Sequence, residues 1–97
     1  MSGPTPLQAL TRRHSTLIRE LLHDKRVRMQ EGAFVIEGAK FCRDLIQHSP
    51  QSILSLILSP RYLNMEDTKA RALRTALNIP QFSCSDVAFD RLSDVEA

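Results

Sequence analysis

Residues 34–38, with the sequence FVIEG, constrain the fold of this chain more than any other stretch. Three consecutive apolar residues followed by an acid are typical of a strand that is buried on both faces. Gly38 supplies the backbone freedom that a tight turn from a strand into a helix requires. We therefore predict a buried strand over residues 33–37.

The chain before this strand divides into a lead-in and a basic helix. Residues 1–10 contain two prolines and a glycine without apolar periodicity, so we expect a flexible lead-in outside the core. Apolar residues then recur at helical spacing, which predicts a helix that starts near Thr11. From Val27 the pattern breaks, and Glu31-Gly32 is typical of a turn into the strand.

The chain after Gly38 alternates between helical and strand-like patterns. We expect a helix from 39 to about His48, a strand over 53–58, a helix capped by Asn64 or Asp67 that runs to Asn78, a strand over 79–83, and a last helix capped by Ser83 or Ser85. The strand over 53–58 is the most apolar and is expected to be central. Arg74 is expected on the outer face of its helix. This order predicts an α/β fold in which helices cover both faces of a parallel sheet.

Composition excludes several classes of protein. The 97 residues are 42% hydrophobic and 25% charged, which suits one compact domain. Cys42 and Cys84 lie far apart, so we expect two buried, reduced thiols rather than a zinc site or a disulfide scaffold. The N-terminus does not resemble a signal peptide, and no apolar run approaches the roughly 20 residues that span a bilayer. We expect a cytoplasmic protein that needs neither a metal nor a membrane.

Catalytic motifs are missing as well. The three glycines form no phosphate-binding loop, and the sequence has no nucleophile elbow. The three histidines are expected to be surface residues, because no acid or nucleophile is placed to work with them. Glu37, at a strand end, is expected to cap a helix or to pair with an arginine. We therefore predict no catalytic residue in this chain.

The basic residues are unevenly distributed. The net charge of the chain is only +2, yet the segment from Arg12 to Arg28 holds six cations and two acids, a net charge of +4. The six cations are Arg12, Arg13, Arg19, Lys25, Arg26 and Arg28. Arg12, Arg19 and Arg26 are seven residues apart and would share one stripe of a helix. Such a stripe is either a solvated face or a row of cations presented to phosphates, and spacing alone favours the solvated face.

Several short motifs together resemble the N-terminal region of the SpoU-type RNA ribose methyltransferases of the SPOUT superfamily. They are Thr11-Arg12-Arg13-His14-Ser15, Ile18 with Leu21-Leu22, Arg28 before Phe34-Val35-Ile36-Glu37-Gly38-Ala39, Ile57 with Ser59-Pro60, Ile79-Pro80 with Phe82-Ser83, and Leu92-Ser93-Asp94-Val95-Glu96. The resemblance covers almost the whole chain. Each motif is short, and the order and spacing of the set make the combination specific.

The resemblance implies a fold and a division of labour. In this family the N-terminal domain is a small three-layer α/β/α sandwich, similar to RNA-binding ribosomal proteins, that recognises substrate RNA. A second, knotted domain dimerises, binds S-adenosylmethionine and transfers the methyl group. Residues 11–97 would be the first domain with its basic helix. The fourth strand and the second domain are expected after Ala97. The chain alone should then be an inactive monomer without a cofactor.

The resemblance also changes the interpretation of the basic segment. We now place phosphate contact ahead of the solvated face and predict that all six cations of residues 12–28 bind RNA. Tyr62 is the only tyrosine, the chain has no tryptophan, and Phe34, Phe41, Phe82 and Phe89 are expected to be buried. Shape and backbone recognition is therefore a better candidate than base stacking.

The leading hypothesis is the substrate-recognition domain of a ribosomal RNA 2′-O-ribose methyltransferase. Two alternatives stay open: a free-standing RNA-binding module of the ribosomal type, and a protein-interaction domain in which the first helix packs on a partner.

Overall fold

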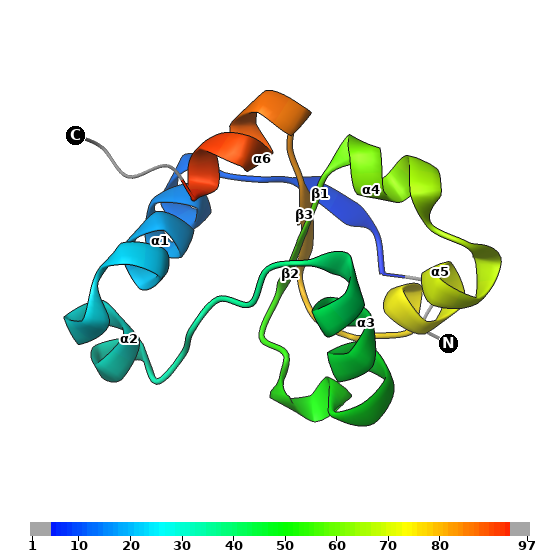
Figure 1. Ribbon diagram of the computed structural model, residues 1–97, viewed down its shortest axis with the longest axis horizontal. Helices are drawn as coiled ribbons and strands as arrows, with labels where there is room; N and C mark the ends of the chain where they lie inside the picture. The colour runs from blue at the N-terminus through cyan, green and yellow to red at the C-terminus, as the bar shows by residue number, and fades with distance from the viewer. Residues whose placement is uncertain (1–4, 94–97) are drawn as a thin grey trace.

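Helices flank a three-stranded parallel sheet in the computed structural model, which describes residues 5–93. The helices are α1 (Arg12–His23), α2 (Lys25–Glu31), α3 (Ala39–His48), α4 (Pro60–Met65), α5 (Thr68–Thr75) and α6 (Asp86–Leu92), with a 3-10 turn at Pro50–Ser52; the strands are β1 (Leu7–Ala9), β2 (Leu56–Leu58) and β3 (Gln81–Ser83). Figure 1 shows α1 and α6 on one side of the sheet and α3 and α5 on the other. The predicted α/β class with parallel strands is confirmed.

The last strand in the sequence, β3, lies in the middle of the sheet. Both of its neighbours run parallel to it, and Phe82 is aligned with Gln8 of β1 and with Ile57 of β2. Gln81 is fully buried and Phe82 is 8% exposed. The prediction that the strand over 53–58 is central is therefore wrong, because β2 occupies an edge.

The other edge of the sheet is formed by residues that we expected to be a flexible lead-in. Leu7–Ala9 pairs with β3, and the segment is held in place just before the strand by Thr5. The Thr5 amide donates to the Thr75 carbonyl at 3.0 Å, and its hydroxyl donates to the Leu77 carbonyl at 2.6 Å. All three β1 residues are exposed. Such a strand needs no apolar periodicity, because its backbone alone satisfies the polar groups of β3, and the expectation was wrong here.

The predicted strand over residues 33–37 is also wrong. The segment is an extended connection without ladder pairing, and Phe34 is 71% exposed. An apolar run becomes a strand only where its backbone pairs with a neighbouring strand, and this segment pairs with neither edge strand of the β1-β3-β2 sheet. Gly38, at φ 104°, does provide the predicted turn into α3.

A single residue separates α1 from α2. A helix starts near Thr11, as predicted; Thr11 itself is the N-cap of α1, and its hydroxyl accepts the His14 amide at 3.1 Å. Asp24 then has an extended backbone that ends α1, and its carboxylate accepts the Arg26 amide at 2.9 Å, which starts α2. The irregular segment predicted from Val27 onward is therefore helical up to the left-handed Gly32, at φ 63°.

Local capping residues explain the remaining helices. Ser59 caps α4, which the sequence analysis missed, and Pro60 occupies the first helical position, where it is favoured. Asp67 caps α5, as one of the two predicted candidates, although the helix ends at Thr75. The predicted helix from residue 39 to His48 is confirmed as α3, and Ser85 caps α6.

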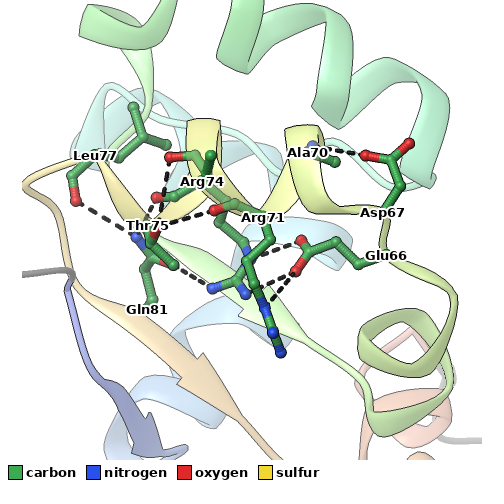
Figure 2. A network of polar contacts seen from close by, with 9 residues as sticks. Glu66, Asp67, Ala70, Arg71, Arg74, Thr75, Leu77 and Gln81 are labelled. Carbon is green, nitrogen blue, oxygen red and sulfur yellow. Dashed lines mark hydrogen bonds and ion pairs between the residues drawn. The ribbon is translucent and has the colours of Figure 1, made fainter.

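A buried ion pair ties α5 to the central strand (Figure 2). Arg74 is 3% exposed, which corrects the expectation that it lies on an outer face. Its guanidinium donates to both carboxylate oxygens of Glu66, at 2.7 and 2.8 Å, and to the side-chain carbonyl of Gln81 at 2.9 Å. The Gln81 side chain in turn donates to the Arg74 carbonyl at 2.8 Å. A buried charge is tolerated here because these partners surround it.

The same network perturbs the ionisable groups around it. Hydrogen bonds from Arg74 hold the pKa of Glu66 below its ordinary value, against the opposing effect of burial. Burial, followed by interaction with the Glu66 carboxylate, raises the pKa of Tyr62 to about 12. Cys42 and Cys84 are half-buried and free, and burial raises the pKa of each thiol. Both thiols therefore stay protonated at neutral pH.

Candidate nucleic-acid interface

The six predicted RNA-binding cations fall into two groups in the structure. Four are exposed and two are half-buried. The exposed cations are Arg12, Arg13, Lys25 and Arg26. The proposed stripe of Arg12, Arg19 and Arg26 does not exist as one helix face, because α1 ends at His23 and Arg26 lies on α2.

The two half-buried arginines bond to helix carbonyls within the domain. Arg19 donates to the carbonyl of Arg91 at 2.5 Å, which ties α1 to the last turn of α6. Arg28 donates to the carbonyl of Leu21 at 2.8 Å, close to the end of α1. The last carbonyls of a helix have no intrahelical partner, so these guanidinium groups satisfy them. Arg19 and Arg28 therefore have structural roles that spacing could not reveal.

Arg12 and Arg13 occupy an electrostatically unfavourable position. They form the first turn of α1, which contains no acid, and a cation beside the positive end of a helix costs about 0.3–1 kcal/mol. Neither forms an ion pair with any residue from 5 to 93. Arg61 near the start of α4 shows the usual solution, since it pairs with Asp90 at 3.2 Å.

Lys25 and Arg26 are also exposed, at the start of α2. The Arg26 side chain is 92% exposed, and its Nε lies 3.7 Å from the Asp24 carboxylate. An exposed ion pair of this length contributes about 1 kcal/mol at most. An incoming phosphate can therefore compete with Asp24 for Arg26. Figure 1 shows α2 beside the C-terminal end of α1. Lys25 and Arg26 begin α2, so the length of α1 separates them from Arg12 and Arg13.

The aromatic residues differ from the prediction. Phe82 is buried and Phe89 half-buried, but Phe34 is 71% and Phe41 66% exposed. Ile36, on the connection into α3, is 38% exposed. Helices α1 and α2 themselves carry no Phe, Tyr or Trp.

The acid and histidine predictions also changed in part. Glu37 is exposed and makes no hydrogen bond or ion pair with the described residues, and Gly38 caps α3 without a side chain. The predicted capping or arginine-paired role of Glu37 is therefore wrong. His14 is half-buried rather than on the surface: its ring centroid lies 4.3 Å from that of Phe82, and its Nε2 lies 3.5 Å from the Ser55 hydroxyl.

Other kinds of site were sought in the described part of the chain. Between residues 5 and 93, no three His, Cys, Asp or Glu side chains are grouped so that they could hold a metal ion. No helix in this range is long and apolar enough to cross a membrane. Arg12, Arg13, Lys25 and Arg26 are exposed cations that can bind anions.

Comparison with known proteins gives one match. A family model described as an MRM3-like substrate binding domain matches residues 18–97. Lys25 and Arg26 lie inside the matched range, whereas Arg12 and Arg13 precede it. The end of the last sequence motif, from Asp94 to Glu96, is inside the match but outside the residues that the structure describes. Neither the curated proteins nor the solved structures include a match.

Proposed function

Because the chain belongs to the family of MRM3-like substrate-binding domains, we propose that it binds structured ribosomal RNA on behalf of a 2′-O-ribose methyltransferase. The observation that carries this proposal is the set of four exposed cations on α1 and α2. Two of them have no charge partner among residues 5–93 and add to the electrostatic cost of α1. A surface that is unfavourable alone becomes favourable when it meets phosphates.

Catalysis is assigned by this proposal to a separate domain. That domain would bind S-adenosylmethionine, supply the methyl group and form the homodimer. Between residues 5 and 93 the chain has two glycines, Gly32 at the end of α2 and Gly38 before α3, and no glycine-rich loop that could hold the cofactor. The cytoplasmic location stays a prediction.

The proposal is tested by titrating the chain with a ribosomal RNA fragment at several salt concentrations. Lys25→Gln/Arg26→Gln should weaken binding and reduce the slope of log affinity against log salt by roughly 0.7–0.9 for each lost phosphate contact. Arg43→Gln/Lys69→Gln is the matched control, because it removes two exposed charges from α3 and α5.

Two results would contradict the proposal. If both double variants lose the same amount of RNA affinity, the net charge of the chain determines binding and the position of Lys25 and Arg26 does not. Absence of RNA binding at low salt, together with recovery of a protein partner, would favour the protein-interaction alternative. A free-standing RNA-binding module predicts the same titration and differs only in lacking the methyltransferase domain.

A further inference from the structure

We propose that the four exposed cations of α1 and α2 bind double-helical RNA at two points, with one strand of the duplex at each end of α1. This inference rests on the proposed function and deepens it, since it names the form of RNA and the arrangement of the contacts. The two contact points are the Arg12/Arg13 pair and the Lys25/Arg26 pair.

The two cation pairs are too far apart to contact the same phosphate. Arg12 and Arg13 lie in the first turn of α1, and Lys25 and Arg26 follow its last residue by two and three positions. A helix of 12 residues rises by roughly 17 Å. One phosphate cannot bridge that distance, so the two pairs must contact different phosphates.

The two cation pairs are not joined by a continuous row of exposed cations along α1. Arg19 is the cation that would continue it, but its guanidinium is half-buried against the end of α6. Its neighbour Glu20 is exposed and carries a negative charge. A single strand that followed α1 would therefore meet an acid midway along its path.

Helices α1 and α2 offer no aromatic side chain of Phe, Tyr or Trp on which RNA bases could stack. Proteins that hold single strands combine a basic groove with aromatic rings on which bases stack. Helices α1 and α2 have no Phe, Tyr or Trp, and the His14 ring lies against Phe82. Paired bases need no such platform, because an RNA duplex presents its phosphates along both edges of a wide, shallow minor groove.

These features together favour a duplex that lies across α1, with each cation pair on one phosphate strand. The exposed Phe34 and Ile36, on the connection into α3, and Phe41, in α3, lie outside α1 and α2. They have no role in this two-point contact.

The test compares an RNA duplex of about 16 base pairs, the length that double-stranded RNA-binding domains span, with a single strand of the same length. The duplex should bind at least about 10-fold more tightly at equal salt. Arg12→Gln/Arg13→Gln and Lys25→Gln/Arg26→Gln should each reduce the duplex salt slope by up to roughly 1.8, the value for two phosphate contacts. The four-residue variant should lose both increments, and Arg43→Gln/Lys69→Gln should lose neither.

Three outcomes would overturn the inference. The two-point contact would be contradicted by a single strand that binds as tightly as the duplex, or by a duplex whose affinity depends on only one cation pair; the proposed function would remain. If no RNA binds, both the two-point contact and the proposed function are contradicted. Circular dichroism of each variant checks that the fold is intact, as expected for substitutions at exposed positions.

Discussion

The Glu66 carboxylate is buried beside the Arg74 guanidinium, and its negative charge balances the positive charge of Arg74. The side chains of Glu66 and Arg74 are 0% and 4% exposed. Breaking a buried pair by removing one charge typically costs about 3–5 kcal/mol, because the other charge is left uncompensated. Paired in this way, two polar side chains fix α5 against β3 through Gln81.

This ion pair predicts how stability depends on acid pH. The pKa of Glu66 lies below its ordinary value of about 4.5, chiefly through hydrogen bonds from Arg74. The unfolded chain therefore binds this proton at a higher pH than the folded chain does. The contribution is complete above the ordinary pKa and is lost as pH falls through the folded pKa.

Glu66→Gln is the variant that isolates this effect. At pH 7 we expect it to unfold with a free energy about 3 kcal/mol lower than that of the wild type. The gap should narrow as pH falls below 4.5, the ordinary pKa of this carboxyl group, and urea unfolding from neutral to acid pH measures it. A gap that stays constant over this range would contradict the assignment.

At the scale of elements, the connection over residues 33–38 and the strand β3 form a contrasting pair. Each contains a phenylalanine, but Phe34 is 71% exposed whereas Phe82 is 8% exposed and packs against His14. Phe82→Ala should lower the free energy of unfolding by about 3–5 kcal/mol, the range for a buried phenylalanine. Phe34→Ala should change it by no more than about 0.5 kcal/mol, as at other surface sites.

Chemical denaturation of Phe82→Ala and Phe34→Ala under the same conditions measures both changes in the free energy of unfolding. A loss of several kcal/mol for Phe34→Ala would show that the connection is buried in solution. That result would contradict the exposed connection and restore the strand predicted from the sequence.

Sequence patterns located elements well where the signal is local. Asp67 and Ser85 cap α5 and α6 and were among the predicted capping candidates, and the first helix starts near Thr11 as predicted. The single-residue corner at Asp24 was missed because an acid between two basic stretches does not look like a helix boundary. The pairing of strands is a property of distant residues, and for this reason the exposed β1 was missed and the connection over 33–37 was predicted as a strand.

The candidate interface was predictable in composition but not in geometry. Counting charges identified six cations, of which the structure leaves four exposed. Arg19 and Arg28 are half-buried because their guanidinium groups donate to the carbonyls of Arg91 and Leu21. Nothing in the spacing of arginines distinguishes one that caps a helix from one that faces solvent.

For the whole molecule, the N-terminal strand offers a direct test of the sheet order. Removing residues 1–9 deletes β1 and its Thr5 anchor and leaves one edge of β3 unpaired. Each lost hydrogen bond contributes about 1 kcal/mol, so we expect a loss of at least about 2 kcal/mol and a melting temperature lower by about 8 °C or more.

Differential scanning calorimetry of the shortened chain measures this change. Leu7→Ser is a suitable control, because it alters an exposed β1 side chain and keeps the backbone ladder. An unchanged melting temperature after the deletion would restore the original interpretation of these residues as a lead-in.

The position of β3 also determines when the sheet can form. Leu7 pairs with Gln81, so the first strand waits for a partner 74 residues further along the chain. Contacts between such distant residues are slow to form, because the entropy of closing the loop must be lost before the pairing compensates for it. On a translating ribosome, α1 and α2 would emerge and could become helical well before any sheet exists to support them. The cationic surface would then be exposed first, and the core that orients it would be completed last.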